Sequence, residues 1–113
     1  MEKFIEIIDT YLLNYSTYKK GKVVFECDYG ELIFNKGVND TLTLFGIYIR
    51  PEYRQQRLCE NILHYLISKS ENEFNYICVQ DVLSKILYEY LLRFNYKGKI
   101  FNNTRKGFIY KIK

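Results

Sequence analysis

The chain has 113 residues, and 17 Lys and Arg against 13 Asp and Glu give it a net charge of +4. This length fits a single compact domain, residues 1–113, and 48% hydrophobic residues exclude a chain that is mainly disordered. The apolar stretches are shorter than the ~20 residues that a membrane-spanning helix requires, so we expect no membrane partner.

The predicted elements follow one another without a linker or a repeat. Apolar residues at helical spacing predict a helix from about Lys3 to Tyr18. Two β-rich runs, Lys22–Cys27 and Glu31–Lys36, flank a turn and predict an antiparallel hairpin. Leu42–Arg50 is apolar on both faces, as in a central strand, and Gly46 within it indicates a bulge or a close backbone approach.

The second half of the chain alternates between helices and strands. A helical stripe runs from Leu58 to about Lys69 and precedes a short buried strand, Asn75–Val79. A third helix is expected over Val82–Phe94, and Tyr96–Lys113 is interpreted as a closing hairpin. Because the unit Leu42–Val79 is strand–helix–strand, it implies parallel pairing through a right-handed crossover. The expected fold class is therefore α/β (α+β), with a mixed central sheet flanked by helices.

The composition and the first residues predict where the protein is found. Met1 to Lys3 lead directly into an amphipathic pattern with no sign of a signal peptide, so we expect a cytoplasmic protein. Lys, Ile, Asn, Tyr and Phe, whose codons are A/T-rich, form nearly half of the chain, and alanine is absent. This bias indicates a low-GC genome, such as that of a virus, a phage or a low-GC bacterium, and for a virus or phage the location would be inside the host cell.

The cysteines and the single histidine exclude several kinds of site. Cys27, Cys59 and Cys78 are odd in number and far apart, so we expect neither a disulfide framework nor a metal site. On one helix Cys59 and His64 would point to different faces, because five residues advance a helix by about 140° beyond a full turn. We therefore interpret the cysteines as core residues and His64 as a surface residue.

The most informative segment, Ile47–Leu63, runs from the end of the expected central strand through a loop into a helix. A helix N-terminus offers unpaired amides and the positive end of the helix dipole, which together favour an anion. Arg54 and Arg57 add positive charge beside it. On this spacing alone, an anion site and an ordinary exposed loop are both consistent with the sequence.

The same segment resembles the acetyl-CoA-binding motif of the GNAT superfamily of N-acetyltransferases. The residues that match without a gap are Pro51, Glu52, Tyr53, Arg54, Gln56, Leu58 and the pair Ile62-Leu63. The resemblance covers residues 22–113 and implies a GNAT-like core that follows an N-terminal helical segment, residues 1–20. The usual first strand of that fold is missing, which would leave a sheet edge open for pairing with another chain.

The resemblance implies that acetyl-CoA is the cofactor and that an amine of unknown identity is the acceptor. The implied cofactor-binding residues are Ile47, Ile49, Arg54, Gln55, Gln56, Arg57, Leu58 and Cys59. Main-chain amides from Gln55 to Cys59 would hold the pyrophosphate, and the strand around Gly46–Ile49 would face the pantetheine arm. Strand Asn75–Val79 would diverge from it to open the slot.

This sequence departs from the family motif at three positions that are usually glycine. Gln55, Arg57 and Cys59 occupy them, so bulkier side chains stand where the phosphates would lie. Arg57 would either donate a hydrogen bond to phosphate or fill the site. A left-handed conformation at such a position costs about 1–2 kcal/mol for any residue other than glycine.

The general acid of the family is a tyrosine near the end of the later helix. Aligning Tyr88-Glu89 with the family's Tyr-Glu pair makes Tyr88 the acid that protonates the leaving thiolate. Aligning Asn95-Tyr96 with the family's Gly-Phe step instead places Leu91 at that position, and the acid is then lost. No acidic residue lies within Leu42–Ile49 to act as a base, and Glu26 and Glu31 on the adjacent hairpin are interpreted as solvated strand carboxylates.

Two functions from different classes remain open on the sequence. One is an acetyl-CoA-dependent N-acetyltransferase, and the alternative is a catalytically inactive GNAT-fold interaction module of a virus or mobile element, with a protein partner or a second copy. Nucleic-acid binding is the weakest reading, because Lys19, Lys20 and Lys22 form only a short basic cluster and no nucleic-acid motif is present.

Overall fold

A computed structural model describes residues 1–37, 40–79, 97–100 and 106–111 of the protein, the last two ranges by their backbone. The described elements are α1 (Glu2–Leu13), η1 (Tyr15–Thr17), β1 (Gly21–Cys27), β2 (Gly30–Lys36), β3 (Thr41–Ile49), η2 (Pro51–Gln56), α2 (Leu58–Ser70), β4 (Tyr76–Val79), β5 (Lys97–Ile100) and β6 (Lys106–Lys111). The third helix predicted over Val82–Phe94 lies outside the described residues.

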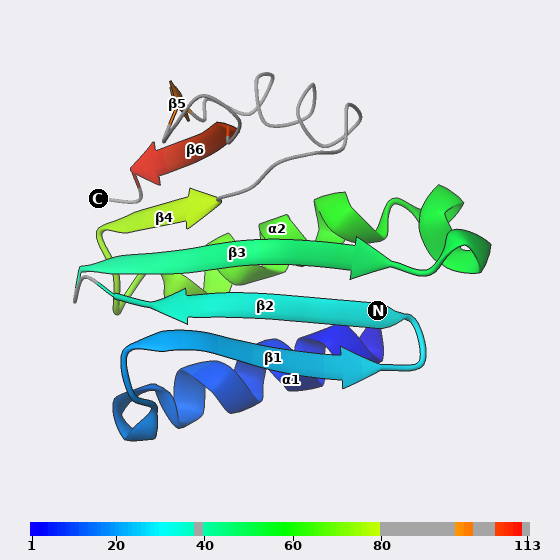
Figure 1. Ribbon diagram of the computed structural model, residues 1–113, viewed down its shortest axis with the longest axis horizontal. Helices are drawn as coiled ribbons and strands as arrows, with labels where there is room; N and C mark the ends of the chain where they lie inside the picture. The colour runs from blue at the N-terminus through cyan, green and yellow to red at the C-terminus, as the bar shows by residue number, and fades with distance from the viewer. Residues whose placement is uncertain (38–39, 80–96, 101–105, 112–113) are drawn as a thin grey trace.

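The strands form one mixed sheet in the order β1-β2-β3-β4-β6-β5. β1, β2 and β3 are antiparallel, β3 and β4 are parallel, and β6 pairs antiparallel with both β4 and β5. The predicted hairpins and the predicted parallel pair are confirmed. Helix α2 makes the crossover between β3 and β4, and Figure 1 shows α1 and α2 on the same face of the sheet.

The first helix ends earlier than the sequence predicts. Its α-helical part stops at Leu13, and a 3₁₀ turn follows in place of the predicted helix to Tyr18. Asn14 Nδ2 donates to the carbonyl of Thr10 at 2.9 Å, and Lys36 Nζ donates to the carbonyls of Tyr15 and Tyr18 at 2.7 and 2.8 Å. These side chains satisfy the terminal carbonyls, so the chain can turn towards β1 without further helical bonds.

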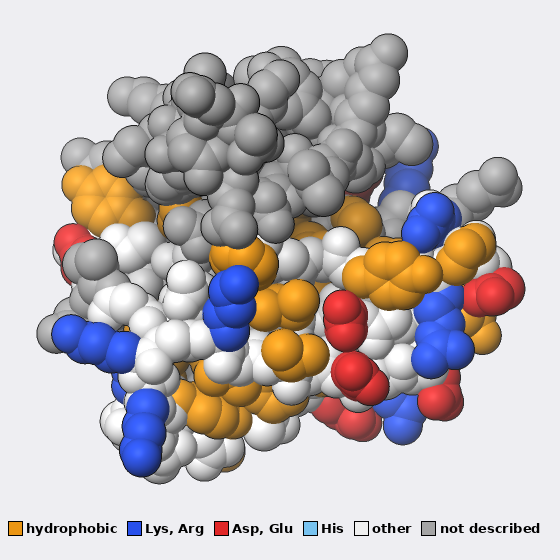
Figure 2. Space-filling view, in the orientation of Figure 1, with side chains coloured by type: hydrophobic (Ala, Val, Ile, Leu, Met, Phe, Trp, Pro, Cys, Tyr) orange, Lys and Arg blue, Asp and Glu red, His pale blue; other side chains and the backbone are white. Residues whose placement is uncertain are grey.

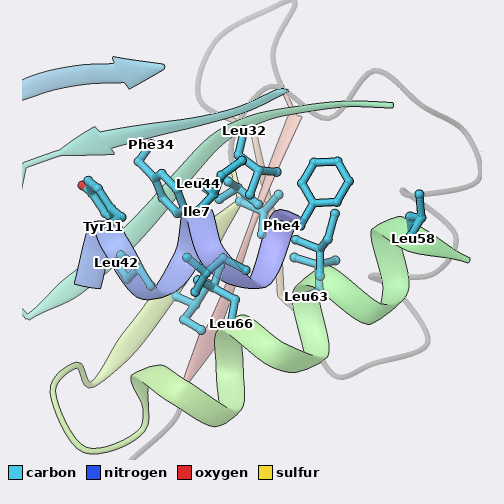
Figure 3. Close-up of a cluster of buried hydrophobic side chains, with 14 of the residues drawn as sticks. Phe4, Ile7, Tyr11, Leu32, Phe34, Leu42, Leu44, Leu58, Leu63 and Leu66 are labelled. Atoms are coloured by element: carbon cyan, nitrogen blue, oxygen red, sulfur yellow. The ribbon is translucent and has the colours of Figure 1, made fainter. Parts of the chain in front are cut away.

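The core lies between the two helices and the sheet (Figure 3). Its fully buried residues come from α1, β2, β3, α2 and β4: Phe4, Ile8, Tyr11, Leu32, Phe34, Leu42, Leu44, Ile62, Leu63, Leu66 and Ile77. The ring of Tyr11 stacks on that of Phe34 with centroids 4.0 Å apart. This stack fixes α1 against the middle of β2.

No helix in the described part of the chain is both long and apolar enough to span a membrane.

The hydroxyl of Tyr11 is buried, and no group in the described part of the chain bonds to it. Burial raises the pKa of Tyr11 above its usual value. We expect Tyr11→Phe to raise the free energy of unfolding by about 1–2 kcal/mol, because the desolvation of an unpaired hydroxyl is removed while the ring stack is kept. Urea unfolding measures this, with Tyr48→Phe at a half-exposed ring as the control that should change little. A loss of stability in Tyr11→Phe would contradict the assignment.

A second contact joins α1 to α2, since Tyr65 Oη donates to Asp9 Oδ1 at 2.7 Å and the bond raises the pKa of Tyr65 to about 12. The unfolded chain therefore loses this proton near pH 10 and the folded chain near pH 12, so the contribution of the bond falls as pH rises through that window. We expect Tyr65→Phe to lower the free energy of unfolding by about 1 kcal/mol at pH 7. The difference in free energy of unfolding between Tyr65→Phe and the unmodified protein should become smaller above pH 10. The double variant Asp9→Asn/Tyr65→Phe should lower the free energy of unfolding little more than either single change does, because both changes remove the same bond.

Candidate functional site

The central strand β3 is much longer than its parallel neighbour β4. The two strands pair from Thr41 opposite Tyr76 to Leu44 opposite Val79, where β4 ends. On its other edge β3 stays paired with β2 as far as Ile49 opposite Gly30. Residues Gly46 to Ile49 therefore have no strand partner on the β4 side within the described part of the chain, and the backbone groups on that side are candidates for pairing with another molecule.

A bulge begins at the point where β4 ends. Ile33 of β2 is opposite Gly46 and Phe34 is opposite Leu44, so Phe45 is an extra residue in β3. A bulge bends and twists its strand, which turns the second half of β3 away from the line of β4. The bulge predicted from Gly46 is confirmed, displaced by one residue.

The close backbone approach, by contrast, is at Gly30. This glycine has φ +151°, and a Cβ there would overlap the carbonyl oxygen of Tyr48. At Gly46 a Cβ would meet Ile33 Cδ1 at 3.5 Å, an ordinary contact. Gly30 therefore lets the β1–β2 turn pack tightly against the end of β3.

The loop after β3 is fixed to its surroundings by several contacts. Arg54 Nε donates to the carbonyl of Ile49 at 2.8 Å, and the backbone N–H of Arg50 donates to the carbonyl of Tyr29 at 2.8 Å. The ring of Tyr53 packs edge-on against that of Tyr29, with centroids 4.5 Å apart. The turn η2 is therefore held by the β1–β2 hairpin and by the strand that it follows.

Arg57 joins this loop to α2 in a left-handed conformation, with φ 55° and ψ 30°. It is the only residue other than glycine with a positive φ in the described part of the chain. This conformation costs about 1–2 kcal/mol relative to glycine, so the backbone here has the form that the family's glycine would favour. The side chain of Arg57 is exposed and does not fill the core beside it.

The N-terminus of α2 follows directly and has no side-chain cap. The first backbone bond of the helix runs from the N–H of Asn61 to the carbonyl of Arg57 at 3.1 Å. Within the described residues, the N–H groups of Leu58, Cys59 and Glu60 have no protein acceptor. Together with the helix dipole, these amides favour an anion next to Arg54 and Arg57.

Most of the predicted cofactor residues lie between the end of β3 and the N-terminus of α2, but they differ in burial and in existing contacts. Ile49 and Leu58 are buried core residues, and Ile47 and Cys59 are half-buried, so each would contribute mainly its backbone. Arg54 is exposed with its Nε already engaged by Ile49, and its guanidinium lies over the ring of Tyr48 at 5.5 Å. The backbone of Gln55 and Gln56 forms the end of η2. Tyr88 lies outside the described residues.

The chemistry of Cys59 excludes it as a nucleophile at neutral pH. Burial raises the pKa of its thiol, the charge of Arg54 opposes that rise, and the charge of Glu60 adds to it. The thiol therefore stays protonated, and thiolate is the reactive form. His64 of the same helix is exposed, and within the described residues no group of His, Cys, Asp and Glu is placed to hold a metal ion.

Sequence reasoning missed the role of Tyr29 around this site, and it considered Glu26 and Glu31 only as separate solvated carboxylates. Tyr29 in the hairpin turn supports the loop, and its isolated position in the sequence gives no signal of that role. Glu31 lies opposite Tyr48 in the β2–β3 register and opposite Glu26 in the β1–β2 register. The alternation of the two strands would have placed these carboxylates on one face.

Comparison with solved structures identifies this arrangement of elements. A protein of the GNAT family from Desulfovibrio desulfuricans superposes with a TM-score of 0.64 at 12% identity, over 96% of this chain and 78% of that one. An acetyltransferase of the GNAT family from Staphylococcus aureus Mu50 gives 0.58 at 12% identity, over 99% and 92%. The fold is that of the GNAT acetyltransferases.

A further structure of this fold contains a ligand. A GNAT family acetyltransferase from Elizabethkingia anophelis with acetyl-CoA bound has a TM-score of 0.60 at 14% identity, over 94% of this chain and 82% of that one. No protein-family model matches the sequence, and no curated protein matches it either. At these identities the likeness shows the GNAT fold alone.

The left-handed residue gives a direct test of the loop. We expect Arg57→Gly to raise the free energy of unfolding by about 1 kcal/mol, because glycine adopts this conformation without strain. Arg57→Ala is the matched control, since it removes the charge but keeps the Cβ, and it should give no such gain. Thermal unfolding should show a rise of about 4–8 °C for the glycine variant alone. Equal shifts in both variants would point to charge as the cause.

Proposed function

We propose that the protein binds acetyl-CoA between β3 and the N-terminus of α2 and transfers the acetyl group to an amine. The observation that carries this proposal is the edge of β3 over Gly46–Ile49, which has no strand partner among the described residues and leads to an uncapped helix N-terminus behind a left-handed residue. The strand edge suits the pantetheine half of such a ligand, and the helix N-terminus suits its pyrophosphate half. The open strand edge would pair with the amides of the pantetheine arm, and the helix amides would hold the pyrophosphate.

The charges around the helix N-terminus support an anionic ligand. Arg50, Arg54 and Arg57 are all exposed on the loop between β3 and α2. Arg54 Nε is held by the carbonyl of Ile49, which leaves the terminal nitrogens of its guanidinium for a phosphate. A hydrogen bond from a charged donor contributes about 1.5–3 kcal/mol, enough to offset the strain at Arg57.

The transfer itself needs a neutral amine, an oxyanion site and an acid. Because an alkyl amine with a pKa near ~10.4 is mostly protonated at neutral pH, a base or a water chain must remove its proton before it attacks the thioester carbonyl. The backbone amides of Gly46–Ile49 are the candidates that would stabilise the oxyanion. Tyr88 is the proposed acid for the leaving thiolate.

Isothermal titration calorimetry with acetyl-CoA tests the binding step. A site saturated at about 100 times its dissociation constant stabilises the fold by about 2.7 kcal/mol, so the melting temperature should rise by several degrees. Desulfo-CoA should compete. Arg57→Glu should weaken binding at least 10-fold by repelling phosphate, whereas Lys3→Glu, the same change of charge on exposed α1, should not.

The transfer step has its own readout. With binding established, Tyr88→Phe should slow the release of free CoA thiol in the presence of amines while leaving the dissociation constant of acetyl-CoA unchanged. The absence of heat and of a thermal shift at millimolar acetyl-CoA would contradict the proposed function and favour the inactive interaction module.

A further inference from the structure

Within the described part of the chain, no helix covers the face of the sheet opposite α1 and α2 over β1, β2 and β3 (Figure 1). Side chains alternate along each strand, so one set points into the core and the other set lies on this second face. On β1 and β2 the second set is Lys22, Val24, Glu26, Glu31, Ile33 and Asn35, and on β3 it includes Phe45 and Tyr48. Figure 2 views this face and shows apolar side chains at its centre, with acidic side chains to their right, a basic side chain to their left, and further basic side chains beyond the acidic ones.

The apolar centre is a row across the three strands. Val24 is directly opposite Ile33, and Ile33 is in turn opposite Gly46, next to the bulged Phe45. Val24 is 52% exposed, while Ile33 and Phe45 are half-buried. An apolar row with polar groups on both sides is typical of a surface that binds another protein.

The charges are separated on the two sides of this row. Glu26 and Glu31 are directly opposite each other, an arrangement of like charges that destabilises a sheet, and no Lys or Arg of the described chain forms an ion pair with either. Lys22 lies on the other side, with Nζ 3.8 Å above the ring of Phe45. Among the described residues the acidic pair therefore has no ion-pair partner, although the guanidinium of Arg54 lies over Tyr48, the residue opposite Glu31, and Lys22 lies across the same face.

We propose that two copies of this chain associate through this face, with a two-fold axis along the apolar row. Rotation about that axis reverses the strand direction, so Val24 meets Val24 of the second copy and Lys22 meets its Glu26 and Glu31. The charge pattern is thus complementary to itself, and each copy neutralises the acidic pair of the other. Two sheets that pack face to face at about 10 Å bring these side chains into contact.

The free edge of β1 is a poorer candidate for self-association. Helix α1 packs over β1, as the contact between the rings of Tyr11 and Phe25 at 6.0 Å shows (Figure 1). Antiparallel pairing of two β1 edges would bring the strands to about 4.8 Å. Because α1 lies along this edge in Figure 1, pairing there would also bring the two α1 helices together, and they would conflict unless they could pack at 8–10 Å. The open face carries no such conflict.

Sedimentation equilibrium of the purified chain measures the association. Because three short strands offer less than the ~800 Å² per partner of a standard interface, we expect a weak dimer with a micromolar or weaker dissociation constant. A rise from 0.1 to 1 M sodium chloride shortens the Debye length from about 10 to about 3 Å, and it should weaken the dimer several-fold. A dimer that salt strengthens, or a monomer at all concentrations, would overturn the proposal.

Charge reversal gives the sharper test. Lys22→Glu should be monomeric, and so should the double variant Glu26→Lys/Glu31→Lys, because each places like charges face to face. Mixed in equal amounts, the two should form a heterodimer again. Leu13→Lys, at a leucine that is 84% exposed on α1 and outside this face, is the control and should dimerise normally. Failure of the mixture to associate, with circular dichroism showing folded variants, would overturn the arrangement.

Discussion

The structure depends on a mismatch in length between the two neighbours of β3. Strand β2 pairs with β3 as far as its last residue, whereas β4 stops at Val79, opposite Leu44. Within the described residues, Gly46 to Ile49 pair with β2 on one side and have no strand partner on the other. The bulge at Phe45 lies at the point of separation, so the same residue that ends the parallel pairing also bends the strand away.

The loop after β3 converts this open edge into a site. Contacts from Tyr29 and Ile49 hold the loop, and the left-handed Arg57 turns the chain into α2. Strain at a non-glycine residue persists only where the surrounding structure fixes the backbone, and here the buried Leu58 on one side and η2 on the other do so. The result is a rigid helix N-terminus with open amides and exposed arginines beside it.

Much of the fold was accessible from the sequence because local signals and the global fold agree. Alternating and helical periodicities placed the first hairpin, β3, α2 and β4 within a few residues, and the gapless segment Pro51–Leu63 indicated the GNAT fold. The end of α1 was predicted too late. The 3₁₀ turn that replaces its predicted last residues is held by Lys36, a residue far along the chain whose side chain donates to the carbonyls of Tyr15 and Tyr18.

The sequence by itself determined the order of elements, the fold class and the segment in which a site would lie, because periodicity, turn residues and motif spacing are local properties. Only the tertiary structure decided that β3 extends beyond the last residue of β4 and that Arg57 is left-handed with its side chain outside the core. It also decided that Glu26 and Glu31 lie directly opposite each other, with an apolar row between them and Lys22. Each of these depends on strand register and on backbone angles. Those are fixed when segments distant in the sequence pack together.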